Sequence, residues 1–254
     1  MLKVTAIILG LLLSLSAHSA GMGYDEARLL LSRSGFSPTR AEVQSYAVLS
    51  RSQAVDKMLA GARTIAATAP PDWATQPIER VRRKELSEEE KKAYQEQQIQ
   101  RGLELRAWWY REMLDTPSPL TEHMTLFWHN HFVSSQQKVK SSQLLYRQNV
   151  LLRQYALGNF GALLHAVAKD PAMLIYLDNA SNRRGQPNEN FAREVMELFT
   201  LGMGNYSERD VREAARAFAG WSLDRDSGDF RFYPGAHDKD DKTILGRTGS
   251  FDGD

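Results

Sequence analysis

Apolar residues recur at helical spacing along most of the chain, and its first part is predicted to form short helices. One helix lies in "YDEARLLLSRSG" and ends at Gly35, a residue type that commonly follows a helix C-terminus. The next lies in "SPTRAEVQSYAVLS", with Ser37 as its N-cap and Pro38 at the first helical position. With a further helix over about residues 52–62, the pattern predicts an N-terminal helical segment, residues 21–63.

A connector rich in Pro and Ala, residues 64–77, is predicted to separate this segment from the main helical core, residues 78–220. The core begins with a charged stretch, residues 78–114, that is predicted to form one long helix. Charges of both signs are mixed in this stretch, so it does not have the pattern of an acidic binding tail. The apolar residues expected to dock its end are Leu105, Trp108, Trp109 and Met113.

The rest of the core is also predicted to be helical. One helix runs from Ser118 through "LFWHNHFVSS", and a later one in "NENFAREVMELFTLG" ends at Gly202. Another opens at Ser207, where Asp210 completes an imperfect capping box. Residues 221–254 are rich in Asp, Gly and aromatic residues, which predicts loops and short strands.

The N-terminus has the pattern of a secretory signal peptide, residues 1–20, in which Lys3 precedes an apolar run over residues 4–15. Cleavage is expected after Ser19 or Ala20. The alternative is an uncleaved anchor, but the run is shorter than the roughly 20 residues that cross a bilayer. We therefore expect a periplasmic or secreted protein without a stable membrane span after cleavage. The expected fold class is mainly α: a multi-helix globular domain with a short C-terminal segment of loops and strands.

Composition narrows the chemistry. The 254 residues include no cysteine, which excludes disulfides, thiolate catalysis and iron–sulfur ligation. Lys and Arg total 32 against 31 Asp and Glu, so the overall charge does not indicate a nucleic-acid partner. The motifs of zinc proteases, di-iron bundles, serine hydrolases and P-loop proteins do not occur in the sequence. A functional site must therefore be sought in local groups of polar side chains.

The stretch "LFWHNHFVSS" places His129, Asn130 and His131 among aromatic residues. On a helix its apolar residues occupy every side, so we expect a buried helix whose polar side chains find hydrogen-bond partners. The two histidines point roughly 200° apart on a regular helix and cannot both bind one ion from it. Each is either a ligand or catalyst, or a buried group that its neighbours satisfy.

A second candidate lies in "NENFAREVMELF". On a helix Asn190, Glu194 and Glu197 share a polar stripe, and Arg193 borders it. Two carboxylates about one turn apart can hold a hard cation or act as acid and base. The alternative is an amphipathic helix whose polar face meets solvent. One of the two histidines above is expected to face this stripe.

Two loops supply further polar groups. "GAHDKDD" contains His237 and Asp238, with more acidic residues nearby, and it can bind a cation or form a solvated turn. The loop "YLDNASNRRGQPNEN" contains Asp178, Arg183 and Arg184 and leads into the helix of the carboxylate stripe. A loop in that position is expected to form the wall of a pocket.

Four segments carry a resemblance to a known family: "ARLLLSRSGFSPT", "LTEHMTLFWHNHFVSS", "KDPAMLIYLDNASNRRGQPNENFAREVMELFTLGMGNYSERDVREAARAFAGWSL" and "HDKDDKTILGRTGSFDGD". Through them the chain resembles the bacterial family named domain of unknown function 1800, whose members look like large, mostly helical exported proteins without an assigned reaction. The resemblance implies that the polar groups share one site. It also implies an exported partner, because members of the family are often encoded next to another exported family of unknown function with sulfatase-like features. Because the family continues past "FDGD", we expect the sequence to be a fragment.

His165, in "ALLHAVA", is expected to be a core histidine.

These patterns lead to two hypotheses. The first is a metal-assisted or acid–base hydrolase of the cell envelope with one pocket and a divalent metal ion. The alternative is a non-catalytic scaffold or partner of another exported protein, in which His129 and Glu194 are fully paired with protein groups. The first assigns catalysis to Glu194, Glu197 and His131, substrate binding to Asn190, Arg193, Asp178 and Trp128, and metal binding to His129, His237 and Asp238.

Overall fold

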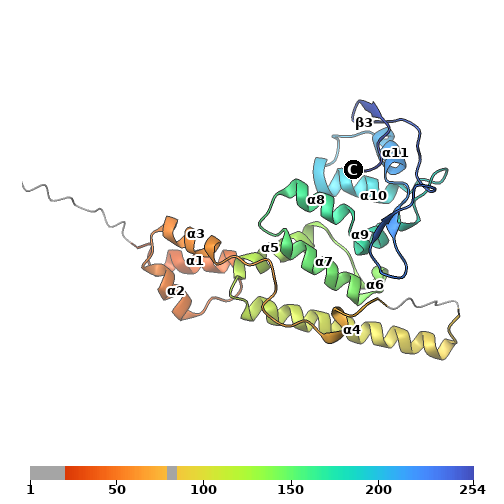
Figure 1. The fold of residues 1–254 in the computed structure, drawn as a ribbon. Helices are drawn as coiled ribbons and strands as arrows, with labels where there is room; N and C mark the ends of the chain where they lie inside the picture. Colours follow the sequence, from red (N-terminus) through yellow and green to blue (C-terminus); the bar gives the residue numbers. More distant parts are fainter. Residues whose placement is uncertain (1–20, 79–84) are drawn as a thin grey trace, which may run out of the picture.

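The computed structural model describes residues 21–78 and 85–254, so the predicted signal peptide lies outside the described residues. Helices dominate this part of the chain, and the short strands follow residue 220, which confirms the predicted fold class (Figure 1). In chain order the helices are α1 (Tyr24–Ser34), α2 (Arg40–Ala47), α3 (Arg51–Ala60), η1 (Asp72–Ala74), α4 (Glu88–Asp115), α5 (Pro119–His131), α6 (Gln136–Val139), α7 (Ser142–Gln154), α8 (Phe160–Ala168), α9 (Pro171–Tyr176), η2 (Asn179–Ser181), α10 (Glu189–Glu194), η3 (Val195–Leu201) and α11 (Glu208–Ala217).

Helices α1, α2 and α3 gather at one end of the molecule around a small apolar cluster. Thr39, and not the predicted Ser37, is the N-cap of α2. The Thr39 side chain accepts a hydrogen bond from the Glu42 backbone N–H, and the Glu42 carboxylate accepts one from the Thr39 N–H at 2.6 Å. This reciprocal pair satisfies two free backbone donors, which explains why the helix begins after Pro38.

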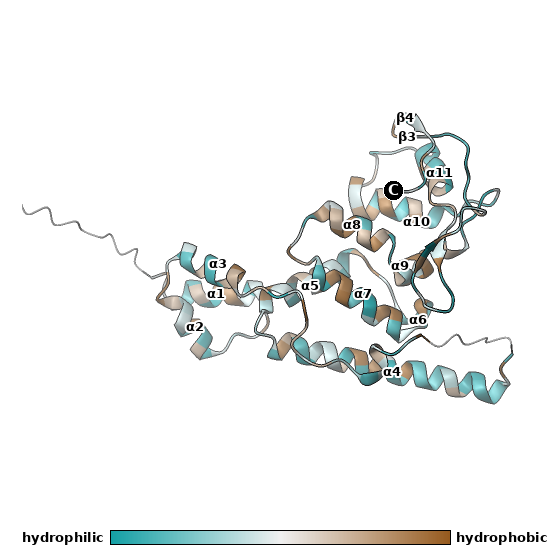
Figure 2. Ribbon diagram, in the orientation of Figure 1, coloured by the Kyte–Doolittle hydropathy of each residue, from teal (hydrophilic) through white to brown (hydrophobic). Residues whose placement is uncertain are grey.

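Helix α4 runs along the base of the molecule, and its first half is hydrophilic (Figure 2). Its second half docks as predicted, because Trp108 and Met113 are buried there. Buried Glu112 accepts hydrogen bonds from the backbone N–H groups of Ala67 and Thr68 at 2.9 and 2.6 Å. The connector is therefore fastened to α4. Part of the predicted long helix, residues 79–84, lies outside the described residues.

The main core lies between α5, α7, α8, α9 and α10. Helix α5 is not buried on all sides as expected, since Phe127 is 50% and Val133, just beyond its end, 46% exposed and Asn130 is exposed as well. His165 is exposed on α8, so the prediction of a core histidine is wrong. Both errors arise because helical spacing alone does not tell which apolar face meets a neighbouring element. The buried members of this core are Phe132, Leu152, Leu163, Val167, Met173, Leu174, Leu177, Phe191, Phe199 and Trp221.

The helix predicted in "NENFAREVMELFTLG" changes type at residue 195. It is α-helical in α10 and a π-helix in η3, and it ends at Gly202, which has a φ of 76°. A π-helix bonds each residue to the fifth one along and so shifts the phase of the faces. The shift explains why Phe199 is buried while Leu198, which a regular α-helix would place on the same side as Phe191 and Val195, is 61% exposed.

Short antiparallel strands complete the described fold. Strands β1 (Trp221–Leu223) and β2 (Phe230–Phe232) pair Trp221 with Phe232, and β3 (Lys242–Ile244) and β4 (Arg247–Gly249) pair Lys242 with Gly249. Strand β3 packs on α11, and β1 packs on α9. Within residues 21–78 and 85–254, none of the helices combines the length and the apolar character that a bilayer crossing requires.

Candidate functional site

Glu194 and Glu197, the predicted acid and base, lie where α10 continues into η3. Glu197 accepts a hydrogen bond from the Tyr206 hydroxyl at 2.5 Å. Burial raises the pKa of Glu194 above its ordinary value, and the negative charge of Glu197 raises it further, while Arg193 acts in the opposite direction. The environments of the two carboxyl groups therefore differ, as acid–base chemistry requires.

The other predicted groups of this helix are tied into local contacts. Arg193 donates hydrogen bonds from two guanidinium nitrogens to Glu208, each at 2.8 Å, and one to Glu189 at 3.2 Å. Asn190 is partly buried, and its backbone N–H donates to the Asn188 side chain at 3.0 Å. Arg193 thus fastens α10 to the start of α11 through ion pairs. A role for Arg193 and Asn190 in substrate binding stays a prediction.

His131 is the histidine that reaches this region. Its Nε2 donates a hydrogen bond to the Phe199 carbonyl oxygen of η3 at 3.2 Å. Since that carbonyl belongs to the π-helix, His131 links the end of α5 to the segment that carries Glu197. Aromatic rings surround its imidazole with centroid distances of 4.6 to 6.5 Å, and they belong to Phe127, Trp128, Phe132, Phe160 and Phe199.

His129 faces the opposite side of α5, as the helical geometry predicts. Its Nε2 accepts a hydrogen bond from the Asn149 side-chain amide at 3.1 Å, and its ring packs on Trp109 with centroids 4.5 Å apart. Burial and, to a smaller extent, the positive charge of Arg153 lower the pKa of His129 to about 4. The imidazole is therefore neutral at pH 7, and it packs in the interior between α4, α5 and α7.

A buried ion pair beside His129 was not predicted from the sequence. Arg153 of α7 pairs with Glu122 of α5, and the two side chains are only 1% and 2% exposed. Glu122 Oε2 accepts further hydrogen bonds from Arg153 Nη2 and Trp109 Nε1, each at 3.0 Å. Among the described residues, Arg153 Nη1 and Asn149 Oδ1 lack a hydrogen-bond partner. This charged group ties α4, α5 and α7 together.

Trp128 and Asp178, predicted to bind substrate, are engaged with the protein. The Trp128 indole N–H donates to the Ala156 carbonyl at 2.9 Å. Asp178 has a left-handed backbone conformation, with a φ of 62°, and forms an ion pair with Lys138 at 2.7 Å. These contacts position the end of α5 and the loop after α9. Their role in substrate binding stays a prediction.

His237 and Asp238 belong to another group of side chains, between α11 and β3. Arg216 donates hydrogen bonds to both carboxylate oxygens of Asp238 at 2.8 and 3.1 Å, which holds the pKa of Asp238 below its ordinary value. His237 Nδ1 donates to the Ala219 carbonyl at 2.9 Å, and its Nε2 lies 3.5 Å from buried Lys242 Nζ. Burial lowers the pKa of Lys242. The group fastens the C-terminal loop to α11.

The predicted metal ligands are therefore divided between elements. His129 contacts α4 and α7, whereas His237 and Asp238 contact α11 and the loop before β1. Nowhere in residues 21–78 or 85–254 do three His, Cys, Asp or Glu side chains form a group that could hold a metal ion. The expectation that one ion gathers these ligands finds no support, because neighbouring protein groups satisfy each of them locally.

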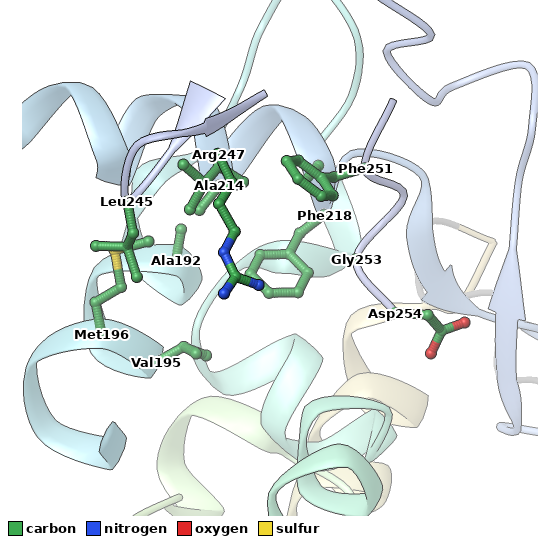
Figure 3. Close-up of a pocket in the computed structure, with 12 residues that line it drawn as sticks. Ala192, Val195, Met196, Ala214, Phe218, Leu245, Arg247, Phe251, Gly253 and Asp254 are labelled. Carbon is green, nitrogen blue, oxygen red and sulfur yellow. The ribbon is translucent and has the colours of Figure 1, made fainter. Parts of the chain in front are cut away.

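An open apolar pocket of about 520 Å³ is lined by residues of α10, η3, α11 and the β3–β4 hairpin, and neither Glu194 nor Glu197 is among its lining residues. Figure 3 shows the Arg247 side chain running from the β3–β4 hairpin down into the pocket, toward the Phe218 ring. The backbone of Arg247 pairs with Ile244 in this hairpin, but its side chain makes no hydrogen bond or ion pair with another described residue. The pocket thus combines apolar walls with the Arg247 guanidinium, while Asp254, its acidic lining residue, pairs with Lys169. Its side-chain walls include Val195, Met196, Phe218, Ile244, Leu245 and Phe251.

Sequence reasoning missed Arg247 and the Glu122–Arg153 pair for different reasons. Arg247 lies in a turn-rich segment without periodicity, and nothing in the sequence relates it to the helix of Val195. Glu122 and Arg153 each interrupt an apolar helical pattern, in "LTEHMTLF" and "NVLLRQYAL". One apolar pattern contains a negative residue and the other a positive one, and this combination could have predicted a buried ion pair.

Comparison with known proteins gives one result. The model of a family described as "Protein of unknown function (DUF1800)" matches residues 29–254. Searches of curated proteins and of solved structures found no match.

Proposed function

We propose a binding function for this chain, which belongs to the DUF1800 family. Because the family is described as one of unknown function, membership does not indicate an activity. The proposed ligand is an apolar molecule that carries one acidic group, and the proposed site is the pocket of Figure 3. This function differs from both hypotheses drawn from the sequence, the hydrolase and the scaffold or partner of another exported protein. The signal-peptide pattern supports a location in the periplasm or outside the cell.

Arg247 is the observation that carries this proposal. Ligand pockets are mostly apolar and use a few polar groups to orient the ligand. Val195, Met196 and Phe218 can cover the apolar part of a ligand, while the Arg247 guanidinium can donate to a carboxylate or sulfonate. Arg247 has no acidic partner among the described residues, because the lining carboxylate of Asp254 pairs with Lys169, so a ligand anion does not have to displace a carboxylate from Arg247.

Replacing Arg247 by alanine is expected to weaken the binding of 8-anilinonaphthalene-1-sulfonate at least tenfold. A hydrogen bond to a charged group contributes about 1.5–3 kcal/mol, and about 1.4 kcal/mol corresponds to tenfold in affinity. The measurement is a fluorescence titration, followed by displacement with decanoate and with decanol. Decanoate should displace the dye far better than decanol does.

Arg28→Ala is the matched control, since Arg28 is an exposed arginine on α1, away from the pocket. It should leave the titration unchanged. The proposal would be overturned if Arg247→Ala bound the dye as tightly as the unaltered protein does. It would also be overturned if decanol displaced the dye as well as decanoate does.

The carboxylate pair supports a second candidate function, an acid–base hydrolase of the cell envelope. The raised pKa of Glu194 beside Glu197, held by Tyr206, favours it. Purified peptidoglycan and envelope polysaccharides incubated with the protein should release soluble fragments, measured as reducing ends. Glu194→Gln should lower the rate about 10²-fold or more, since general acid–base catalysis contributes 10²–10⁴.

For this candidate Glu89→Gln, at an exposed position in the first turn of α4, is the control that should retain full release. Fragment release that survives Glu194→Gln would refute the assignment of Glu194. The hydrolase candidate as a whole fails if the unaltered protein releases nothing from these polymers.

A further inference from the structure

A second pocket, of about 920 Å³, lies between the loop that leads into α10 and the β1–β2 hairpin. The loop is part of the segment "YLDNASNRRGQPNEN", which the sequence analysis expected to form a pocket wall, and residues 180–183 and 186–189 do line this pocket. The hairpin contributes Ser222, Leu223, Arg225 and Tyr233. Most of its lining groups are polar, in contrast to the pocket of Figure 3.

Buried amides hold the loop in place. The Asn179 side chain donates hydrogen bonds to the carbonyl oxygens of Phe218 and Trp221 at 3.3 and 3.0 Å. The Asn182 side chain donates to the Ala215 carbonyl at 2.8 Å and accepts from the Asn188 N–H at 3.0 Å. Both amides are at most 3% exposed. The pocket is thus formed before any ligand arrives, which reduces the entropy lost on binding.

A glycine allows the close approach of loop and hairpin at the base of this pocket. Gly220 has a φ of 88°, and a Cβ atom there would lie 2.7 Å from the Tyr233 carbonyl oxygen. Its N–H donates to the Asn182 carbonyl at 3.1 Å, and its carbonyl accepts from the Tyr233 N–H at 2.8 Å. The base of the pocket is therefore main chain that is already hydrogen-bonded.

Each of the two segments that line the pocket contributes an arginine, Arg183 from the loop and Arg225 from the hairpin. The Arg183 guanidinium donates to Gln186 Oε1 at 3.2 and 2.7 Å, which holds it in one orientation without neutralising it. Arg225 is exposed and makes no ion pair or hydrogen bond with another described residue. Glu189 is the acidic lining residue, and it already pairs with Arg193 at 3.2 Å. The loop and the hairpin therefore each bring an unneutralised positive charge to the pocket.

Neutral groups with unused hydrogen-bonding capacity also line this pocket. Gln186 and Asn188 each accept through the side-chain oxygen, so their NH₂ groups remain free to donate to a ligand. Ser181 donates its hydroxyl proton to the Asp178 carbonyl at 2.9 Å, so its oxygen remains free to accept. A lining that offers both donors and acceptors matches a ligand with several hydroxyl groups.

We propose that this polar pocket binds an acidic saccharide, with a sugar carboxylate between Arg183 and Arg225 and sugar hydroxyls on Gln186, Asn188 and Ser181. Planar guanidinium groups match a carboxylate, and amides match hydroxyls. Tyr233, whose ring packs on Arg231 at 5.2 Å, is the aromatic lining residue. Because Arg231 already lies over the Tyr233 ring, a nucleobase has little free aromatic surface to stack on, so the lining favours a hydroxyl-rich ligand over a nucleotide. The pocket is separate from that of Figure 3, and the proposal does not depend on the proposed function.

The test is isothermal titration of the full chain with a galacturonate trimer. The trimer should bind, and Arg183→Ala and Arg225→Ala should each lower its affinity at least tenfold. Arg28→Ala, which removes an exposed arginine of α1, should leave the affinity unchanged. Binding should weaken as salt is added, since charge pairing carries part of it.

Neutral maltotriose and inorganic phosphate are the comparison ligands. Both should bind at least tenfold more weakly than the acidic trimer. Phosphate that binds as tightly as the trimer would show a simple anion site and overturn the saccharide assignment. The proposal also fails if no trimer binding is detected, or if both arginine variants bind as well as the unaltered protein.

Discussion

Replacing Glu122 by glutamine is expected to lower the free energy of unfolding by about 3–5 kcal/mol, because breaking a buried ion pair leaves the other charge uncompensated. Arg153 would remain almost fully buried, with its Nη1 already lacking a partner. The same change would weaken the hydrogen bond that Glu122 accepts from Trp109. Urea unfolding, followed by circular dichroism, measures the loss.

A double-mutant cycle separates the ion pair from packing effects. Arg153→Met should be destabilising by a similar amount, and the double variant should lose clearly less than the sum of the two single losses. Arg147→Met is the control on the same helix, since Arg147 pairs with Asp229 at the surface, where such pairs contribute only about 0–1 kcal/mol. The assignment of a coupled buried pair would be contradicted if the two single losses in free energy of unfolding simply added in the double variant. It would also be contradicted if Glu122→Gln lowered the free energy of unfolding by less than about 1 kcal/mol.

A second large effect is expected from Asp170, the N-cap of α9. Burial raises the pKa of Asp170 to about 7, although its carboxylate accepts hydrogen bonds from the Met173 N–H and the Gln148 amide, at 2.9 and 2.8 Å. Below the unfolded pKa of 3.8 both states hold the proton. Between pH 3.8 and pH 7 only the folded state keeps the proton on Asp170, so the free energy of unfolding falls as the pH rises through this window.

The Asp170 contribution amounts to about 4 kcal/mol, because each pKa unit corresponds to about 1.4 kcal/mol. Asp170→Asn can keep both hydrogen bonds and should lack this decline, so its stability relative to the unaltered protein should increase from pH 4 to pH 8. Asp115→Asn, at the exposed end of α4, is the control and should follow the unaltered protein. Parallel pH profiles of Asp170→Asn and the unaltered protein, measured by urea unfolding, would contradict the prediction.

His129 changes the free energy of unfolding in the opposite direction over an overlapping pH range. Its pKa of about 4 lies below the unfolded value of 6.5, so between these values only the unfolded state binds the proton. Stability therefore falls on this account as the pH drops from 6.5 to 4. The two slopes oppose each other in the unaltered protein, and Asp170→Asn should reveal the slope of His129. Adding His129→Gln to the Asp170→Asn variant should remove this remaining dependence of stability on pH.

The sequence was sufficient for the local structure of this fold. Capping residues and glycines marked real helix ends, such as Ser207, with its capping box, and Gly202. The change to a π-helix at residue 195 could not be predicted, because it depends on how Phe199 packs against Phe132, with ring centroids 5.0 Å apart. Local patterns determine caps, whereas the phase within a helix is determined by its neighbours.

The candidate site was predictable only in part. The stripe of Glu194 and Glu197 was visible from helical spacing, and opposite orientations of His129 and His131 followed from the same geometry. Their grouping into one pocket did not follow, because tertiary contacts decide which polar groups meet. Arg247 joins the helix of Val195 through a hairpin about 50 residues later in the chain, and no local rule connects such positions.

The π-helix η3 also affects how this chain is aligned with its relatives. A π-turn holds one residue more than an α-turn between hydrogen-bonded groups, so η3 is equivalent to a helix with an inserted residue. A relative with a regular α-helix here would need a one-residue gap within residues 195–201. Without that gap, Phe199 would be compared with an exposed position, and the carbonyl that His131 binds would be assigned to the wrong residue.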